Sequence, residues 1–436
     1  MPPQGFEATT SEQDSESSPL FKGNLFESDQ PAQPATCNDG SKTKAVFGCL
    51  AIVALLLVVA RHRLADYQPT GPYKVVEVQR GHEFFDYYDF FDGADSLGSA
   101  GYNTYVSRKR ADELGLIDFA LDHGRESVYL ETTPTLDKGF RESIRLEGKQ
   151  RFDRGLFLLD VEHMPSGCGV WPAFWLTDEA DWPNNGEIDI LEGINSQSVA
   201  KTALHTSDQC SMYAHVPSYA MTGSFDSATG IPDTFTGDLN TFNRVEADNC
   251  WVMAPHQWGN QGCIIVESEE GTIGKPMNEV GGGIYALEWD PANGYIKSWV
   301  FKRDSIPENL QESMDTASLK DNVLPDPDSW PLPYAYFAIG DKSGCSADHF
   351  KNMRLVLNTA FCGAVAGNKF AADCPKEAEK FDVDGDSVLT CNAYLEDQQD
   401  RLTEAYWKIR GAYVYEREME HKKTSSGDQG QDQDQN

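Results

Sequence analysis

The sequence predicts an all-β domain, folded as a sandwich or a barrel, behind a single N-terminal transmembrane helix. Between residues 84 and 415, short alternating or apolar runs recur between Gly, Pro and Asn breaks, as in proteins built from many short strands. The helix is predicted from the uncharged run 45–60. The length of 436 residues allows one large β-domain with extensions or two small domains. The clearest expected strands are 127–131, 143–146, 156–161, 187–191, 283–289, 296–301 and 353–357.

The N-terminal segments predict a tail and a membrane anchor. Residues 1–44 are rich in Ser, Pro, Glu, Asp and Gln, which predicts a disordered cytosolic tail. As a helix, the run 45–60 would span about 24 Å, and snorkelling of Lys44 and Arg61 can extend it toward the ~30 Å of a bilayer core. We interpret it as a retained signal anchor, because a cleaved signal peptide would need a short, positively charged segment before it.

The remaining segments follow in order along the chain. Pro69, Gly71 and Pro72 predict a stem linker over 61–80, before a catalytic domain over 81–416. Two polar or Pro-rich insertions, 208–262 and 304–333, are expected to form loops over a cleft, and 395–409 is expected to be a short helix. The tail 417–436 is predicted to be disordered.

The orientation of the anchor depends on two opposing signals. Lys and Arg are more frequent just after the run than before it, which favours a cytosolic C-terminus. Eight of the ten cysteines follow the run, however, and an even number in loop-like segments favours disulfides in an oxidising compartment. We therefore predict a type II membrane protein with a lumenal or extracellular catalytic domain. Local pairing is the simplest expectation for two of its bridges, Cys345–Cys362 and Cys374–Cys391.

The charge of the chain restricts its partners. The formal net charge is −33, so polyanions such as nucleic acid and sulfated polysaccharides are repelled, whereas a neutral polysaccharide is not. The chain has no Cys or His spacing typical of a zinc site and no Gly-rich phosphate loop. Residues 382–389 resemble half of a calcium-binding EF-hand loop, but the bidentate Glu is replaced by Ala393, which favours an acidic turn between Cys374 and Cys391.

The octapeptide Gly186–Gly193 carries the clearest functional signal. Its apolar residues predict a strand, on which Glu187 and Asp189 point to the same side. A bulge near Ile190–Leu191 would turn Glu192 to that side too. The two Glu backbones would then be about 13 Å apart, and side chains leaning inward could approach the roughly 5–5.5 Å of a retaining glycosidase. The alternative is an ordinary strand with a solvated acidic edge.

The surrounding segments favour catalysis, because they resemble glycoside hydrolase family 16, and most closely its fungal laminarinase-like endo-1,3(4)-β-glucanases. The resemblance covers about residues 84–415 and implies a concanavalin A-like β-sandwich jelly roll with the glucan in a cleft. It is carried by Gly186-Glu-Ile-Asp-Ile-Leu-Glu-Gly193, Cys168-Gly-Val-Trp-Pro-Ala-Phe-Trp175, Leu204-His-Thr-Ser207, Gly282-Gly-Ile-Tyr-Ala-Leu-Glu-Trp289 and Asn358-Thr-Ala-Phe-Cys-Gly363.

The resemblance also implies the catalytic roles. Glu187 would be the nucleophile and Glu192 the general acid and then base. Asp189 would share a hydrogen bond with Glu187 and help to keep one carboxyl protonated. His205 matches the family's histidine beside the acid/base; the alternative is a structural histidine. This two-carboxylate mechanism needs no metal or cofactor.

Aromatic residues are candidate sugar platforms, because a pyranose packs its C–H face on an aromatic ring. For each of them the alternative is a place in the core, which we expect for Trp289 and Trp407. Tyr102 and Asn103 either line a negative subsite or form a turn. The candidate platforms are Trp171, Trp175, Trp182 and Trp330.

These observations predict a membrane-anchored retaining endo-β-glucanase that hydrolyses β-1,3 or mixed β-1,3/1,4 glucan. A second hypothesis keeps the same site but transfers the glycosyl unit to another glucan, and membrane anchoring favours it. A third, a non-catalytic glucan-binding receptor, is disfavoured because all three carboxylates are present.

Overall fold

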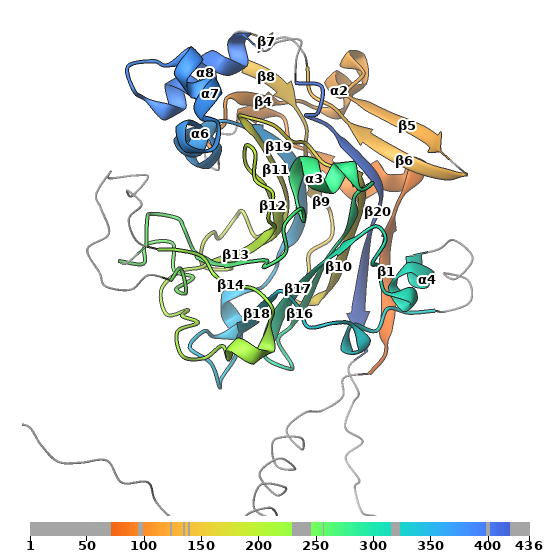
Figure 1. The fold of residues 1–436 in the computed structure, drawn as a ribbon. Helices are drawn as coiled ribbons and strands as arrows, with labels where there is room; N and C mark the ends of the chain where they lie inside the picture. Colours follow the sequence, from red (N-terminus) through yellow and green to blue (C-terminus); the bar gives the residue numbers. More distant parts are fainter. Residues whose placement is uncertain are drawn as a thin grey trace, which may run out of the picture. The chain divides into compact units, whose positions relative to one another are not determined.

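Two large antiparallel β-sheets lie face to face in the computed structural model (Figure 1). The structure describes residues 71–418, except 95–98, 123, 134–135, 138–139, 229–245, 256, 315–322 and 398–401. These residues belong to one compact unit, Gln68–Asn436. The predicted segments 1–44 and 45–60, the stem up to residue 70 and the tail from 419 lie outside the described residues.

The first sheet contains eight strands, which pair in the order β18-β17-β16-β10-β20-β6-β5, with β1 also paired to β20. The first and last strands that the structure describes, β1 and β20, are therefore neighbours in this sheet. Its strands are β1 (Tyr73–Gln79), β5 (Ile117–Asp122), β6 (Arg125–Leu130), β10 (Gly155–His163), β16 (Gly283–Asp290), β17 (Tyr295–Lys302), β18 (Ala335–Ala338) and β20 (Trp407–Arg417).

The second sheet, which carries the candidate site, has the order β14-β15-β13-β12-β11-β19-β9-β2. Its strands are β2 (Tyr88–Phe90), β9 (Arg145–Gly148), β11 (Val170–Thr177), β12 (Glu187–Glu192), β13 (Lys201–His205), β14 (Ser224–Phe225), β15 (Cys263–Val266) and β19 (Arg354–Phe361). A small third sheet contains β3 (Gly93–Ala94), β4 (Asn103–Tyr105), β7 (Leu136–Asp137) and β8 (Phe140–Ser143).

Helices are short and lie between strands. The helices α6, α7 and α8 pack on one another and form a helical insert between β19 and β20 (Figure 1). The α-helices are α2 (Arg108–Leu114), α3 (Gly274–Glu279), α4 (Glu308–Met314), α6 (Asn368–Asp373), α7 (Pro375–Phe381) and α8 (Ser387–Asp397). Other helical turns are Gly81–Tyr87, Ser218–Ala220, Pro327–Ser329, Ala347–His349 and Gly363–Gly367.

Alternation along the strands builds the core between the two large sheets. On β10, Phe157 and Leu159 point into this core, and on β11, Phe174 and Leu176 meet them from the other sheet. Leu156 and Leu158 point to the opposite side of β10, into a second cluster on the outer face of the first sheet. The predicted β-sandwich is therefore confirmed, and Trp289 and Trp407 are buried in it, each 1% exposed.

The two insertions cover opposite outer faces of the sandwich. Ala228 and Ala247 pack on Ala203 and Ile264 of the second sheet, next to the candidate site. The described part of 304–333 instead packs on the outer face of the first sheet, through α4 and Trp330. The expectation that both insertions lie over one cleft is therefore wrong for 304–333, whose apolar side chains cover a hydrophobic sheet face.

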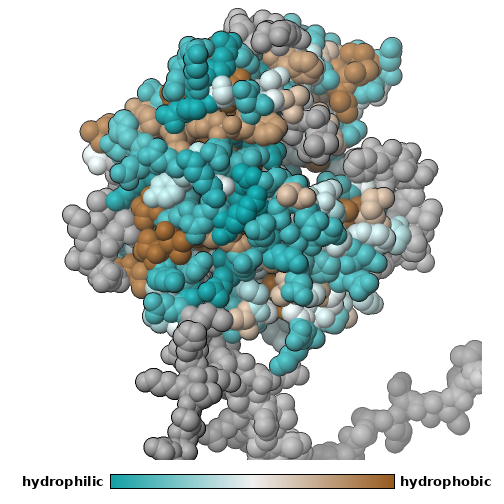
Figure 2. All heavy atoms as spheres, turned by 180° about the vertical axis from the view of Figure 1, so that it is seen from behind, coloured by the Kyte–Doolittle hydropathy of each residue, from teal (hydrophilic) through white to brown (hydrophobic). Residues whose placement is uncertain are grey.

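The expected helix over 395–409 is also wrong. α8 ends at Asp397, and Trp407 begins β20, where alternate side chains enter the core between the sheets. The seven expected strands are observed, although 143–146 is divided between β8 and β9 at Ile144. In the part of the chain that the structure describes, no helix has the length and apolar character needed to cross a bilayer. The face seen in Figure 2 is mainly hydrophilic, with limited hydrophobic patches.

All eight cysteines after residue 60 form disulfides, but the expected pairs Cys345–Cys362 and Cys374–Cys391 are wrong. β19 lies between Cys345 and Cys362, and each of the two cysteines bonds a partner from another segment, Cys210 and Cys391. Cys374 bonds Cys168, just before β11, and Cys391 bonds Cys362, just after β19. The observed bridges are Cys168–Cys374, Cys210–Cys345, Cys250–Cys263 and Cys362–Cys391.

Candidate active site

β12 presents three carboxylates on the outer face of the second sheet. Its pairing with β11 skips one residue: Leu191 faces Phe174, whereas Asp189 faces Trp175, so Ile190 is the extra residue of a bulge. The predicted bulge is confirmed. Ile188, Ile190 and Leu191 are buried in the core between the sheets, while Glu187, Asp189 and Glu192 contact side chains on the opposite face.

Glu187 accepts a hydrogen bond from the indole of Trp182. Trp182 Nε1 lies 2.7 Å from Glu187 Oε2. The Trp182 ring is 41% exposed, so it can serve as a sugar platform while it fixes the carboxylate. Burial and the neighbouring Asp189 carboxylate raise the pKa of Glu187 to about 8. Glu187 is therefore mainly protonated at neutral pH in the free protein and must lose this proton before it can act as a nucleophile.

Asp189 and His205 form a buried pair beside Glu187. His205 Nε2 lies 3.2 Å from Asp189 Oδ2, and one oxygen of Glu187 lies within 4.8 Å of both side chains. Burial raises the pKa of Asp189, against the hydrogen bond from His205. Although burial acts in the opposite direction, the hydrogen bond to Asp189 and the charge of Glu187 raise the pKa of His205 to about 9. His205 is thus a cation at neutral pH and places a positive charge beside Asp189 and Glu187.

Glu192 has a donor at each oxygen. Trp171 Nε1 lies 3.0 Å from Oε1, and the ammonium of Lys201 lies 3.4 Å from Oε2. Trp171 is only 8% exposed and packs against Ile194 and Ala366. Little of its ring is therefore open to a sugar, and the structure supports its hydrogen bond to Glu192 rather than a role as a platform. These donors fix the carboxyl group in place on the sheet.

Trp175 lies on the same face, next to these groups. Its indole Nε1 donates to Asn358 Oδ1 at 2.8 Å, and the guanidinium of Arg145 lies 5.2 Å from its ring. Asn358 in turn donates to the Tyr105 hydroxyl. Trp175 is therefore a held, partly exposed aromatic ring beside the carboxylates, which agrees with its predicted place.

Three predicted binding residues lie elsewhere. Trp330 packs edge-on against Trp299 and Phe301 on the outer face of the first sheet, so both sheets separate it from Glu187, and its predicted role is wrong. Asn103 is 1% exposed, and its side-chain Oδ1 accepts a hydrogen bond from the backbone amide of Phe361. Its side chain therefore cannot line a subsite directly.

The hydroxyl of Tyr102 is engaged by the helical insert. Its hydroxyl donates to Glu396 of α8, and in the described part of the chain it makes no hydrogen bond to the three acids. Its predicted contact with sugar stays a prediction.

Sequence reasoning missed Lys201, Arg145 and Asn358. Lys201 alternates with Ala203 and His205 along β13, so period-two alternation places it on the face already assigned to His205. Asn358 belongs to a quoted segment of the resemblance but had no role assigned. Arg145 had no local signal, because its contact with Trp175 depends on the packing of distant strands.

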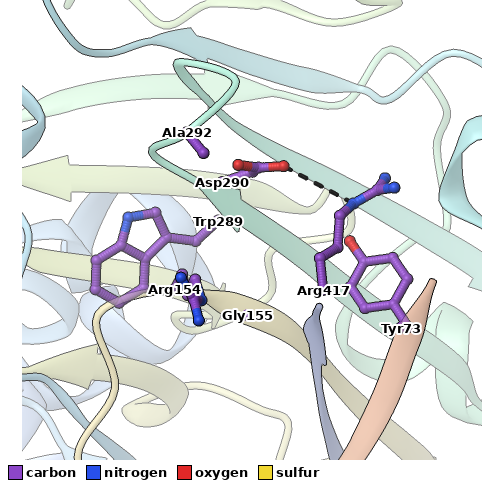
Figure 3. Close-up of a pocket in the computed structure, with 7 residues that line it drawn as sticks. All are labelled: Tyr73, Arg154, Gly155, Trp289, Asp290, Ala292 and Arg417. Carbon is purple, nitrogen blue, oxygen red and sulfur yellow. Dashed lines mark ion pairs between the residues drawn. The ribbon is translucent and has the colours of Figure 1, made fainter. Parts of the chain in front are cut away.

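Other polar clusters are less suited to a ligand. The pocket in Figure 3 lies where Tyr73, Asp290 and Arg417 meet and encloses about 10 Å³, room for about one water molecule. The acidic turn 382–389 is also not a site: Asp382 and Asp386 bind backbone amides of their own turn, and among the described residues its carboxylates do not converge on a shared point. Its flanking cysteines, Cys374 and Cys391, belong to different bridges.

The raised pKa of Glu187 predicts a pH-dependent stability difference. Because the folded pKa lies above the ordinary 4.5, the stability due to neutral Glu187 is present below pH 4.5 and lost as the pH rises through about 8. Glu187→Gln removes this loss, so its melting temperature should match wild type near pH 4 and exceed it near pH 8 by on the order of 2 °C or more. Thermal scans across this range test it, with exposed Glu113→Gln as the control. A difference that does not change with pH contradicts the buried-carboxyl assignment.

Comparison with known proteins places this geometry in a family. A family model described as "XgeA-like, catalytic GH16 domain" matches residues 88–415. The endo-1,3(4)-β-glucanase xgeA of Emericella nidulans is 34% identical over 376 residues, which are 85% of this chain and 50% of that protein. A probable glycosidase of Schizosaccharomyces pombe is 32% identical, over 79% of this chain and 69% of its own. The chain spans about half the length of the first of these relatives.

Solved structures show the same sandwich. An elongating GH family 16 β-1,3-glucosyltransferase has a TM-score of 0.61 and 30% identity, over 79% of this chain and 100% of its own. Laminarinase 16A from Phanerochaete chrysosporium, with 6-O-glucosyl-laminaritriose in both donor and acceptor sites, has a TM-score of 0.62 and 29% identity, over 79% of this chain and 99% of its own. These relatives indicate a glycoside hydrolase.

Proposed function

Because the chain belongs to glycoside hydrolase family 16, we propose that it is a retaining endo-β-glucanase acting on β-1,3 or mixed β-1,3/1,4 glucan. The observation that carries the proposal is the bulge at Ile190, which places Glu187 and Glu192 on one face of β12. Each carboxylate is held by an indole, and a third acid, Asp189, lies between them.

The proposed mechanism is the two-carboxylate mechanism of retaining glycosidases, with one role for each of the two Glu residues of β12. Glu187, once ionised, attacks the anomeric carbon while Glu192 gives its proton to the leaving glycosidic oxygen. In the second step, Glu192 takes a proton from water while the water oxygen bonds to the anomeric carbon. The bond between that carbon and Glu187 breaks, which releases the sugar. His205, paired with Asp189, keeps its positive charge near Glu187 while the charge of Glu187 changes during the reaction. Trp182 and Trp175 provide aromatic surface for the flanking sugars.

A glucan transferase is the second candidate. It uses the same carboxylates, and a sugar hydroxyl replaces water in the second step. The likeness to an elongating β-1,3-glucosyltransferase supports it, at 30% identity. A laminarinase structure with glucan in donor and acceptor sites is equally similar, so the fold alone accommodates either outcome.

A single experiment separates the candidates. The full-length chain is incubated with laminarin, with and without added laminaritriose, and products are separated by size. Hydrolysis predicts shorter oligosaccharides in both cases, with the β-anomer formed first in proton NMR spectra. Transfer predicts products that carry the added laminaritriose at their reducing end, which an isotope label in the acceptor identifies, whereas hydrolysis leaves the labelled trisaccharide unextended. Absence of any new product, or an initial α-anomer, contradicts a retaining glucan-active enzyme.

The cellular location is part of the proposal. We infer a type II membrane protein with the β-domain in the lumen or outside the cell, anchored by residues 45–60. Four disulfides in the β-domain support an oxidising compartment. Protease treatment of sealed microsomes should leave the β-domain intact, and its digestion would contradict this orientation.

A further inference from the structure

Lys201 is a buried cation beside the acid/base that the proposed mechanism does not yet use. It begins β13, where His205 pairs with Glu187 and Ala203 pairs with Asp189 on β12. Two residues further along the same face, Lys201 reaches Glu192, with 3.4 Å between Nζ and Oε2. The side chains of Lys201 and Glu192 are 14% and 17% exposed, so water screens the pair only weakly.

The charged groups around this pair come from three segments. β12 contributes Glu187, Asp189 and Glu192, β13 contributes Lys201 and His205, and Asp226 follows β14. Burial alone would lower the pKa of Lys201, but the charges of Glu192 and Asp226 raise it, so the ammonium keeps its proton at neutral pH. Trp171, on β11, is the uncharged donor to Glu192.

We propose that Lys201 is a positioning residue that stabilises the Glu192 carboxylate left after proton transfer to the glycosidic oxygen. The inference rests on the proposed function. In the first step, the C–O bond breaks, Glu187 bonds to the anomeric carbon, and the Glu192 proton goes to the leaving oxygen. Lys201 keeps its proton throughout, and its charge faces the new carboxylate. It therefore assists departure of the leaving group.

The distinction from a purely structural lysine is electrostatic. A structural lysine would affect folding and the amount of active protein, so its loss would lower kcat/KM on every substrate by the same factor. An ammonium that faces the carboxylate formed on Glu192 matters only where the leaving oxygen needs a proton from Glu192. Removal of that charge should therefore slow laminarin more than a substrate whose leaving group needs no protonation.

The test compares Lys201→Gln, Lys201→Arg and wild type in the full-length chain, on laminarin and on a laminaribioside with a 2,4-dinitrophenyl leaving group. Gln can still donate to Glu192 but carries no charge, whereas Arg restores the charge. We expect kcat/KM on laminarin to drop about tenfold in Lys201→Gln while kcat/KM on the dinitrophenyl substrate changes little, and we expect Lys201→Arg to reverse the loss. Lys408→Met, which breaks a Lys–Glu pair on the other sheet, is the control and should leave the ratio of the two kcat/KM values unchanged.

The outcomes separate the two proposals. If wild type does not act on laminarin, the proposed function fails. If wild type is active but Lys201→Gln lowers kcat/KM on both substrates by the same factor, the role of Lys201 is wrong. If Lys201→Gln fails to fold, as judged by its thermal melt, Lys201→Arg decides: a folded Arg variant that loses tenfold or more on laminarin alone also overturns the inference, and a retained ratio of the two kcat/KM values supports it.

Discussion

Glu187→Gln and Glu192→Gln should each lower kcat on laminarin by on the order of 100-fold or more while the sandwich stays folded. Glu187 supplies the bond to the anomeric carbon, and Glu192 supplies the proton to the leaving oxygen. Gln has nearly the same shape as Glu and can still accept the indole hydrogen bonds from Trp182 and Trp171. Steady-state kinetics at several pH values, with circular dichroism of each variant, measure the effect.

The two variants should also differ from each other. A leaving group that needs no protonation, such as 2,4-dinitrophenol, should restore the first step in Glu192→Gln but not in Glu187→Gln. Glu416→Gln, on β20 of the first sheet, is the control, since its carboxylate pairs with Arg154 rather than with residues of the candidate site. Near-normal activity on laminarin in either active-site variant would contradict the assignment.

Removing the Cys168–Cys374 disulfide, through Cys168→Ala and Cys374→Ala together, should lower the free energy of unfolding by about 3–5 kcal/mol. The bridge joins residues 206 apart in sequence, so it closes a long loop in the unfolded chain. It also ties the helical insert to the segment before β11, which carries Trp171. Chemical denaturation of the double variant measures the loss.

The Cys250–Cys263 bridge provides the matched control. It joins residues only 13 apart, and the same model predicts a loss of about 2–3 kcal/mol for the corresponding double variant. Peptide mapping without reduction checks the connectivity first. Equal stability of both double variants and wild type would contradict the loop-entropy account of these bridges.

Local patterns were sufficient to predict the centre of the site. Alternation and the excess residue at Ile190 placed Glu187, Asp189 and Glu192 on one face, because strand geometry is set by the residues of the strand itself. The contact between Trp182 and Glu187 follows a turn only a few residues before β12. His205 was predicted from its segment, and the pairing of β12 with β13 brings it to Asp189.

Features that depend on long-range packing were predicted poorly. Trp330 lies in a Pro-rich segment that is typical of a binding loop, yet its ring packs on the apolar outer face of the first sheet. The disulfides link segments that only the packed sheets bring together, so proximity in sequence was a poor guide. Alternation along β13 could have placed Lys201 on the same face as His205. Its contact with Glu192, however, requires both the bulge in β12 and the register between β12 and β13.

Trapping of the glycosyl-enzyme tests the central claim most directly. The full-length chain is incubated with a laminaribiosyl fluoride that carries fluorine at C2, which slows the release of the sugar from its nucleophile. The protein is then digested, and the labelled peptide is sequenced by mass spectrometry. The account predicts one sugar per chain, bonded to Glu187, and no label in Glu187→Gln. A sugar bonded to Asp189 or Glu192 in the wild-type chain would contradict it.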